Sequence, residues 1–331
     1  MRLHTNPHRL AALAALALCA AVALPAHAQS DAAKAYPTRA VHVIVGNVAG
    51  SGNDLIARLY CQKLSDAMGQ PFVVENKPSS GSLIAGEFVA KSAPDGYTLL
   101  MATSGLMVNA PVMYSKLAFS TQHDFAPIST ASSFPVVLIS NASLPVASVQ
   151  ELLRYAKDNP RKANYGAAGS ALQLAGALFR ARSGVPMEHI PYKGGSQVVS
   201  AVAGGDVIMA LVDAGSVIGA LKGGKIRALA VTTPKRSTLL PNVPTMAEAG
   251  VRDLEIELWN AFFAPKGTPA GIVNKLQEET ARIAKLPEMR ERLFTLAAEP
   301  TSSTPEELAR IVSTELARWT AVAKSAGIKP E

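Results

Sequence analysis

The chain contains few cysteines, few aromatic residues and few charges for its length. Cys19 and Cys61 are its two cysteines among 331 residues, and Cys19 falls in a leader-like segment. A mature chain with Cys61 alone has no intrachain disulfide, so its fold depends on its apolar core. Hydrophobic residues make up 48% of the sequence, whereas aromatic residues make up 5%. The shortage of aromatic side chains argues against stacking-driven binding of nucleic acids or sugars.

Catalytic and metal-binding motifs are also missing from the sequence. It contains no H-E-x-x-H, C-x-x-C or G-x-S-x-G pattern, so zinc chemistry and the hydrolase nucleophile elbow lack support. His42 and His189 fall in strand patterns and are interpreted as structural. Ser104 and Ser170 would need a neighbouring base to act as nucleophiles, and the sequence identifies none. We therefore predict no catalytic residue, no metal site and no cofactor.

The first 28 residues have the features of a secretory signal peptide. Arg2 and Arg9 make the start basic, an Ala/Leu-rich run follows over Leu10–Leu24, and Ala26–Ala28 supplies small residues for cleavage. The apolar run is short for a membrane anchor and has no basic stop after it. We therefore predict export to the periplasm with cleavage after Ala28. The remaining excess of basic residues is small and scattered, which argues against a nucleic-acid partner and weakly favours anionic ligands.

From Ala40 onward, short β-branched runs alternate with amphipathic segments. In the N-terminal block this pattern predicts strands at Val41–Val45, Phe72–Val74 and Tyr97–Ala102, separated by helices at Asp54–Met68 and Leu83–Ala93. A β-α-β-α-β order requires a mostly parallel sheet with right-handed crossovers. The fold class is therefore α/β.

The same alternation returns in the middle of the chain, and the last third is helical. Predicted strands of the middle block are Phe134–Ser140, Asn164–Gly166, Glu188–Tyr192, Val207–Val212 and Ile226–Thr232, and its predicted helices are Val149–Lys157, Leu172–Ser183, Gln197–Ala203 and Ile218–Lys222. Pro269 fits the first turn of a helix to about Leu286. Thr304 with Pro305 fits the start of another, which ends near Ala326.

Two sheets served by one chain require two crossings. The apolar stretches Asp124–Thr130 and Glu257–Ala264 lie at the edges of the middle block and are the predicted hinge connections. Residues 29–130 with 257–331 would then form lobe 1, and residues 131–256 would form lobe 2.

Small, Gly- and Ser-rich loops follow five of the predicted strands. These loops are Gly46–Asp54, Thr103–Gly105, Tyr165–Ser170, Tyr192–Ser196 and Asp213–Ser216. Ligands of open α/β sheets bind beyond the carboxyl ends of the strands, and the N–H groups that open a helix favour negative charge. Five such loops in two blocks predict facing sets of backbone donors suited to carboxylate oxygens. Gly50-Ser51-Gly52 lacks the third glycine of a dinucleotide loop and the Gly-Lys-Ser/Thr end of a P-loop.

Ordered motifs run along the whole mature chain. They are Tyr36–Arg39, Val74–Pro78, Ala93–Leu100, Asp124–Pro127, Pro191–Gly194, Gly223–Thr232, Pro241–Thr245 and Ala264–Pro269. With these motifs in this order, the chain resembles the Bug-type receptors of tripartite tricarboxylate transporters. The resemblance implies a two-lobed, type II-like periplasmic binding-protein fold. Each lobe would be a mostly parallel sheet flanked by helices, and the lobes would close on a small organic anion, a carboxylate.

The resemblance also implies ligand contacts from both lobes, through backbone groups and bridging water. The chain departs from the family pattern at Gly46–Gly52 and in a shortened loop before Gln173, where Asn47 or Gln173 would add a side-chain amide. The predicted ligand-binding residues are Asn47, Ala49, Gly50, Ser51, Gly52, Asn53, Asp54, Thr103, Ser104, Ala168, Gly169, Ser170, Gln173, Tyr192, Lys193, Gly194 and Asp213.

The resulting hypothesis is a monomeric periplasmic receptor that delivers a small organic acid to the permease subunits of a tripartite transporter. One alternative is a binding module that signals to a membrane sensor, and another is an enzyme on the same scaffold. Asp213 has two interpretations. It pairs with an amine, hydroxyl or cation of the ligand, or it caps the helix that follows.

Overall fold

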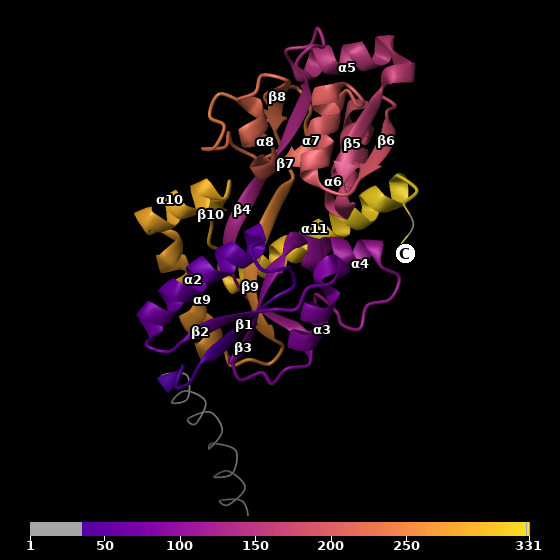
Figure 1. The fold of residues 1–331 in the computed structure, drawn as a ribbon. Coiled ribbons are helices and arrows are strands. Elements are labelled where there is room, and N and C mark those ends of the chain that lie inside the picture. The colour runs from indigo at the N-terminus through magenta and orange to yellow at the C-terminus, as the bar shows by residue number, and fades with distance from the viewer. Residues whose placement is uncertain (1–34, 329, 331) are drawn as a thin grey trace, which may run out of the picture.

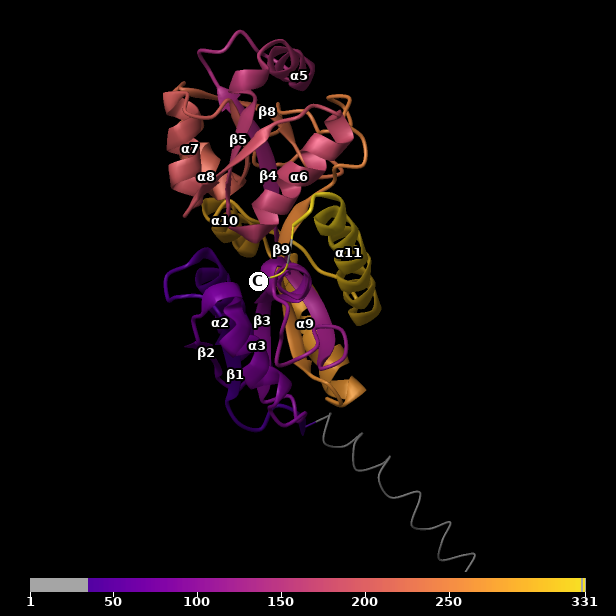
Figure 2. The same ribbon diagram turned by 90° about the vertical axis from the view of Figure 1, so that its right-hand side faces the viewer.

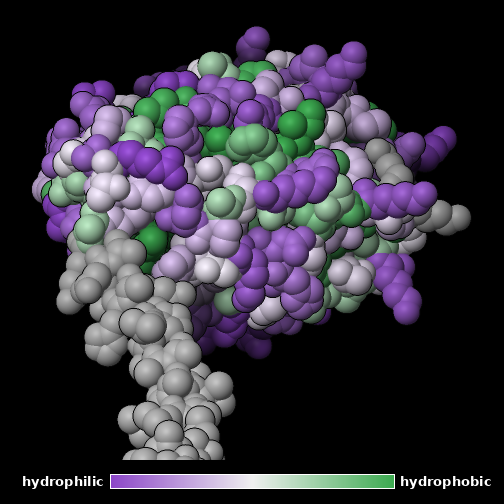
Figure 3. Space-filling model, turned by 90° about the horizontal axis from the view of Figure 1, so that it is seen from below, coloured by the Kyte–Doolittle hydropathy of each residue, from purple (hydrophilic) through white to green (hydrophobic). Residues whose placement is uncertain are grey.

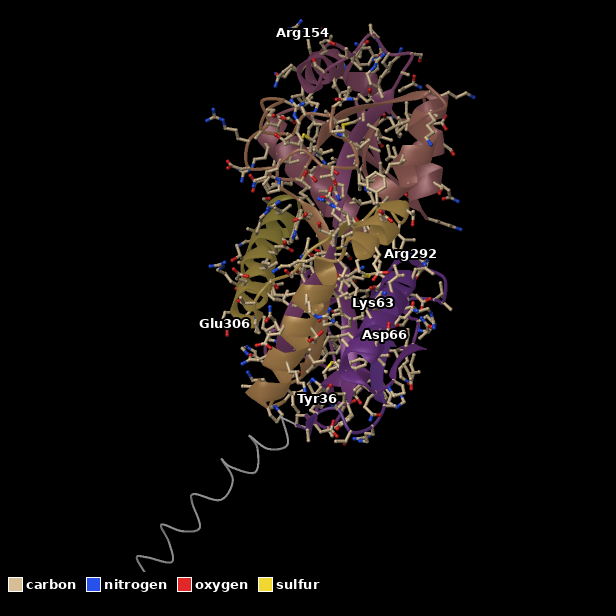
Figure 4. All side chains as sticks on the ribbon, turned by 90° about the vertical axis from the view of Figure 1, so that its left-hand side faces the viewer. Tyr36, Lys63, Asp66, Arg154, Arg292 and Glu306 are labelled. Atoms are coloured by element: carbon tan, nitrogen blue, oxygen red, sulfur yellow. The ribbon has the colours of Figure 1, made fainter. Side chains whose placement is uncertain are left out.

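The computed structural model describes residues 35–328 and Pro330. The predicted signal peptide, residues 1–28, lies outside this part of the chain. Two lobes stand one above the other, and α10 (Pro287–Thr295) and α11 (Pro305–Ser325) lie at the waist between them (Figures 1 and 2). Tyr36 and Arg154 mark the two far ends of the molecule in Figure 4. No helix of the described residues is long and apolar enough to cross a membrane.

Lobe 1 is built on a parallel β-α-β-α-β unit. Its elements are β1 (Val41–Val45), α2 (Gly52–Met68), β2 (Phe72–Asn76), α3 (Leu83–Ala90), β3 (Thr98–Thr103), a π-helical segment (Gly105–Asn109), α4 (Ala110–Met113) and α9 (Ala270–Ala284). Strand β1 pairs in parallel with both β2 and β3. Helices α2 and α9 cover one face of this unit, and α3 covers the other.

Helix α2 shows why these segments fold as they do. Ile56, Tyr60 and Leu64 follow one another at four-residue spacing and are fully buried against the sheet. The Ser51 side chain accepts a hydrogen bond from the N–H of Asp54 and starts the helix, and Gly69 ends it in the left-handed conformation. The carboxyl end of β1 is thereby linked to a helix N-terminus through one short loop.

Lobe 2 repeats this plan. Its elements are α5 (Val149–Asp158), β5 (Asn164–Ala168), α6 (Gly169–Ser183), β6 (Glu188–Tyr192), α7 (Gly195–Gly204), β7 (Met209–Asp213), α8 (Ala214–Leu221) and β8 (Ile226–Val231). Strand β5 pairs in parallel with β6 and β7. Gly176 lets α6 lie directly on the ring of Tyr165, because a Cβ at Gly176 would approach that ring to 2.1 Å.

Two long strands pass between the lobes. Strand β4 (Phe125–Asn141) pairs with β9 (Glu257–Pro265) as far as Pro135, and with β7 from Val136 onward. Strand β4 therefore exchanges β9 for β7 as its partner between Pro135 and Val136, a few residues beyond the predicted lobe boundary at 130/131. The return crossing coincides with the start of β9 at Glu257.

The described strands form one continuous ten-stranded sheet that is shared by both lobes. Its order is β2-β1-β3-β9-β4-β7-β5-β6, and β8 and the short β10 (Glu299–Pro300) also pair with β4. The predicted parallel sheets are confirmed for β2-β1-β3 and for β7-β5-β6. The strands β4, β8, β9 and β10 run antiparallel to their partners. The sheet is therefore mixed, with its antiparallel part at the connection between the lobes.

Helix α11 begins as predicted and contacts both lobes. Thr304 and Glu307 form a capping box, and Pro305 occupies the first turn. The helix packs against β4 and against α6 of lobe 2. It is also tied to β9, since the Trp259 indole N–H donates to Glu315 Oε2 at 3.2 Å.

The exposed large apolar side chains of the described residues all belong to lobe 1. They are Val48, Leu55, Val73, Ile84, Phe88 and Phe294. From below, the surface of lobe 1 is a mixture of polar and apolar side chains without one dominant apolar patch (Figure 3). Isolated apolar residues of this kind are normal on a soluble surface.

Candidate functional site

A cavity of about 500 Å³ is lined by strand ends and loops of both lobes. Lobe 1 contributes Asn47, Ser79, Ser80, Gly81, Ser82, Thr103, Gly105, Leu106, Ala110, Met113 and Tyr114, and lobe 2 contributes Ala167, Gly169, Gln173, His189, Pro191 and Tyr192. This volume is typical of small-molecule sites. None of these residues is an Asp, Glu, Lys or Arg, so the cavity wall consists of neutral polar and apolar groups.

Asn47 is held at the end of β1 by two other asparagines. Asn53 Nδ2 donates to Asn47 Oδ1 at 3.0 Å and to the Met101 carbonyl at 3.3 Å. Asn76 Nδ2 donates to the Asn47 carbonyl at 3.0 Å. Because the Oδ1 atom of Asn47 is already engaged, its amide N–H₂ is the end that remains for a ligand.

Asp54 braces the same loop from behind the cavity. Its side chain is 1% exposed, and it accepts hydrogen bonds from the Gly50 N–H at 2.8 Å, Arg58 Nε at 3.0 Å and Asn76 Nδ2 at 2.9 Å. Burial alone would raise the pKa of this carboxyl group, but hydrogen bonds from Arg58, Gly50 and Asn76 outweigh burial and hold the pKa below its usual range. Asp54 is therefore an ionised brace of the loop and not part of the cavity wall.

We expect Asp54→Asn to destabilise the fold by about 2–4 kcal/mol at pH 7, because a neutral amide replaces a buried carboxylate that three donors satisfy. A depressed native pKa contributes stability above the unfolded pKa near 4, and this contribution is lost as the pH falls. Urea unfolding of the wild type and of Asp54→Asn between pH 7 and pH 3 measures how the free energy of unfolding depends on pH. Asp66→Asn, which removes an exposed carboxylate from the same helix, is the matched control. If Asp54→Asn lost stability toward low pH as much as the wild type does, the assignment of Asp54 as an ionised brace would be contradicted.

The segment Ser79–Ser82 contributes to the cavity although its role was not predicted. It follows β2, and Ser82 Oγ donates to the Gly46 carbonyl at 3.1 Å. Ser82 has a left-handed backbone, with φ of 60°, and it lies directly against Gly46. Ser80 Oγ and the Tyr114 hydroxyl are 3.0 Å apart. A small-residue loop after a strand is the signal that would have identified this segment, as it did for four of the five predicted loops.

The two predicted residues in the loop after β3 have different roles. Thr103 lines the cavity, and its Oγ1 accepts from the Leu106 N–H at 3.2 Å. Ser104 is buried and accepts from the Trp259 N–H at 3.4 Å, so it supports β9. The hydroxyl hydrogen of Thr103 is then available to an acceptor in the cavity.

Lobe 2 presents Gly169, Gln173 and Tyr192 to the cavity. Gly169 begins α6 with φ of 75°, and no side chain caps this helix start. The Lys193 N–H is already engaged, because it donates to Gln197 Oε1 at 3.2 Å, and Lys193 does not line the cavity. The uncapped N–H groups of α6 are therefore the lobe 2 donors best placed for an anion.

Asp213 caps helix α8. Its Oδ1 accepts from the Ser216 N–H and its Oδ2 accepts from the Ser216 hydroxyl, both at 2.9 Å. The capping interpretation therefore describes the structure, and Asp213 does not line the cavity.

His189 lines the cavity, where only a structural role was predicted. Its ring packs on Tyr165 at a centroid distance of 5.1 Å. Its buried Nε2 has no hydrogen-bond partner among the described residues. Burial first, and then the positive charge of Arg180, lower the pKa of the imidazole, so His189 is neutral at pH 7.

The structure thus brings five predicted residues together in the cavity: Asn47, Thr103, Gly169, Gln173 and Tyr192. The others lie outside its lining, namely Ala49, Gly50, Ser51, Gly52, Asn53, Asp54, Ser104, Ala168, Lys193, Gly194 and Asp213. The side chain of Ser170 lies outside the described part of the chain. No group of three or more His, Cys, Asp or Glu residues in the described ranges is arranged to hold a metal ion. The arrangement is suited to binding an acid through neutral donors from two sides.

Comparisons with known proteins identify the family of the chain. The model of the "Tripartite tricarboxylate transporter family receptor" matches residues 56–328. The curated Protein BugT of Bordetella pertussis is 33% identical over 324 residues, which cover 97% of this chain and 98% of that protein.

Solved structures of similar fold include two that carry acids. Rpa4515 of R. palustris, solved with adipate, has 37% sequence identity and a TM-score of 0.75, and the match covers 89% of this chain and 100% of that one. MatC of Rhodopseudomonas palustris, solved with bound malate, has 30% identity and a TM-score of 0.70, with coverage of 87% and 99%.

Proposed function

The chain belongs to the tripartite tricarboxylate transporter family of receptors, and from this premise we propose that it is a periplasmic receptor that captures a small organic acid and passes it to a membrane permease. The observation that carries the proposal is the cavity whose lining comes from both lobes. A ligand that contacts both lobes stabilises the closed arrangement over the open one, and the β4 and β9 crossings are where the lobes would move. The acids bound by Rpa4515 and MatC support the ligand class.

The groups available in the cavity support binding as its role. The cavity holds hydroxyl, amide and backbone N–H donors, and these suit carboxylate oxygens. Its only imidazole, His189, is not hydrogen-bonded to any serine, threonine or carboxylate among the described residues, so nothing there forms a nucleophile–base pair. The proposed receptor therefore releases its ligand unchanged.

We expect calorimetry and thermal unfolding to reveal binding in a panel of mono-, di- and tricarboxylates and acidic amino acids. An acid at about one hundred times its Kd stabilises the folded protein by about 2.7 kcal/mol. Tyr192→Phe removes the hydroxyl of a residue that lines the cavity and should weaken binding about tenfold. Tyr155→Phe, a matched exchange on α5 outside the cavity, should leave it unchanged. A panel without any binder, or turnover of a bound acid, would overturn the proposal.

A further inference from the structure

The Ser79–Ser82 segment and Tyr114 form a polar corner of the cavity that belongs to lobe 1 alone. Ser80 Oγ and the Tyr114 hydroxyl are 3.0 Å apart, and both residues line the cavity. Ser80 is exposed and Tyr114 is partly exposed, so this corner is open to solvent in the structure. The loop after β1, the loop after β3 and the start of α6, which hold the other polar groups of the cavity, are separate elements.

The backbone of the segment holds the two hydroxyl groups of this corner together. Gly81 has φ of 61°, and a Cβ there would approach the Tyr114 ring to 3.0 Å and its hydroxyl oxygen to 3.2 Å, so the contact requires glycine. Ser82 is left-handed as well, with φ of 60°, although serine disfavours this conformation. Ser79 Oγ accepts from the Ile84 N–H at 3.0 Å and ties the segment to the start of α3. The pair is therefore arranged before a ligand binds, which lowers the entropy cost of binding.

The Ser80–Tyr114 pair offers a hydrogen-bond donor and acceptors at the same place. Each hydroxyl group has one hydrogen and also accepts hydrogen bonds. Whichever of the two donates within the pair, the other keeps its hydrogen, and both oxygens retain the capacity to accept. A ligand hydroxyl matches this set, because it accepts the remaining hydrogen and donates to one of the oxygens. A carboxylate matches it less well, since it only accepts, and the cavity lining contains no lysine or arginine.

On the basis of the proposed function, we propose that the Ser80–Tyr114 pair is a subsite for a hydroxyl group on a ligand carbon distant from the carboxylate. The ligand hydroxyl accepts from the free hydrogen of the pair and donates to one of its oxygens. The carboxylate binds to donors on other elements of the cavity. The receptor therefore binds such hydroxy acids more tightly than the unsubstituted acids of the same length.

Calorimetry with three pairs of acids tests this subsite. The hydroxy acids 4-hydroxybutanoate, 5-hydroxypentanoate and 6-hydroxyhexanoate differ from butanoate, pentanoate and hexanoate by a terminal hydroxyl group. We expect at least one hydroxy acid to bind about fivefold more tightly than its parent, because it gains hydrogen bonds at an accessible site. Equal affinities within every pair, or binding by other acids of the panel but by none of these six, would overturn this inference and leave the proposed function intact. Failure of every acid would overturn both.

Tyr114→Phe and Ser80→Ala identify the groups responsible for the preference. Each removes one hydroxyl of the pair and should lower the preference for the hydroxy acid to about twofold or less, while the parent acid binds as it does to the wild type. Tyr155→Phe, the same exchange on α5 outside the cavity, should keep the full preference. A preference that survives in both variants would refute the assignment to the pair. An equal loss of affinity for the hydroxy acid and its parent would also refute it, because the pair would then only position the Ser79–Ser82 segment.

Discussion

Gly46→Ala should weaken ligand binding by about one hundredfold and destabilise the fold by about 1–3 kcal/mol. A Cβ at position 46 would lie 2.2 Å from Ser82 Cβ, 2.6 Å from Ser82 Oγ and 3.0 Å from Ser82 Cα. Ser82 Oγ can rotate away, but Ser82 Cα is backbone and Ser82 Cβ is fixed to it, so the clash with these two atoms remains. The Ser79–Ser82 segment must therefore move, and it carries part of the cavity wall with it.

A second substitution should rescue this variant. Ser82→Gly removes the two side-chain atoms that the new methyl group meets, and glycine adopts the left-handed backbone at position 82 without cost. The double variant should therefore recover most of the lost stability and affinity, apart from the hydrogen bond that Ser82 Oγ makes to the Gly46 carbonyl.

Calorimetry with the best acid of the panel and urea unfolding measure both effects. Gly52→Ala is the matched control in the same loop, since a Cβ there meets no atom within 4 Å. It should change stability by less than about 0.5 kcal/mol. Full affinity in Gly46→Ala would show that the Ser79–Ser82 segment takes no part in binding.

Much of the fold could be predicted because hydrophobic periodicity reports local structure. Val41–Val45 and the start of α11 at Pro305 were predicted at the residues where they occur. Strand β4 was predicted only from Phe134, whereas it begins at Phe125. The missed part, FAPISTASS, is rich in Ser, Ala and Pro, which are poor strand formers, and its pairing with β9 supplies what propensity lacks.

The candidate site was predictable as loops but not as side chains. Glycine and serine after a strand indicate where the backbone is free to approach a ligand, and cavity residues were found in four such loops or directly beyond them. The tasks of individual polar side chains depend on contacts that are not local in sequence. Asp54 accepts a hydrogen bond from Asn76 of the next strand, and Ser82 donates to Gly46 because β1 and β2 are neighbours in the sheet.

Glu315→Gln should stabilise the protein at pH 8 by about 2–3 kcal/mol and leave its stability at pH 4 unchanged. Burial first raises the pKa of this carboxyl group to about 7, and Glu257 adds to the rise, whereas Trp259 and Arg318 oppose it. The folded state therefore holds a proton that the unfolded chain releases near pH 4.3. The wild type loses stability as the pH rises from about 4.5 to 7, at about 1.4 kcal/mol for each unit of pKa difference.

Glutamine reproduces the protonated form, since its amide oxygen still accepts from the Trp259 indole N–H that now bonds Glu315 Oε2 at 3.2 Å. Urea unfolding of both proteins from pH 4 to pH 8 should therefore give curves that meet at low pH and separate above pH 5. Glu306→Gln is the matched control, because Glu306 is an exposed carboxylate on the same helix (Figure 4). Curves that stay parallel for Glu315→Gln, or an equal separation for Glu306→Gln, would show that Glu315 is ionised in the folded protein. The contact between α11 and the lobe-crossing strand β9 would then be an ordinary ion-to-indole hydrogen bond without pH dependence near neutrality.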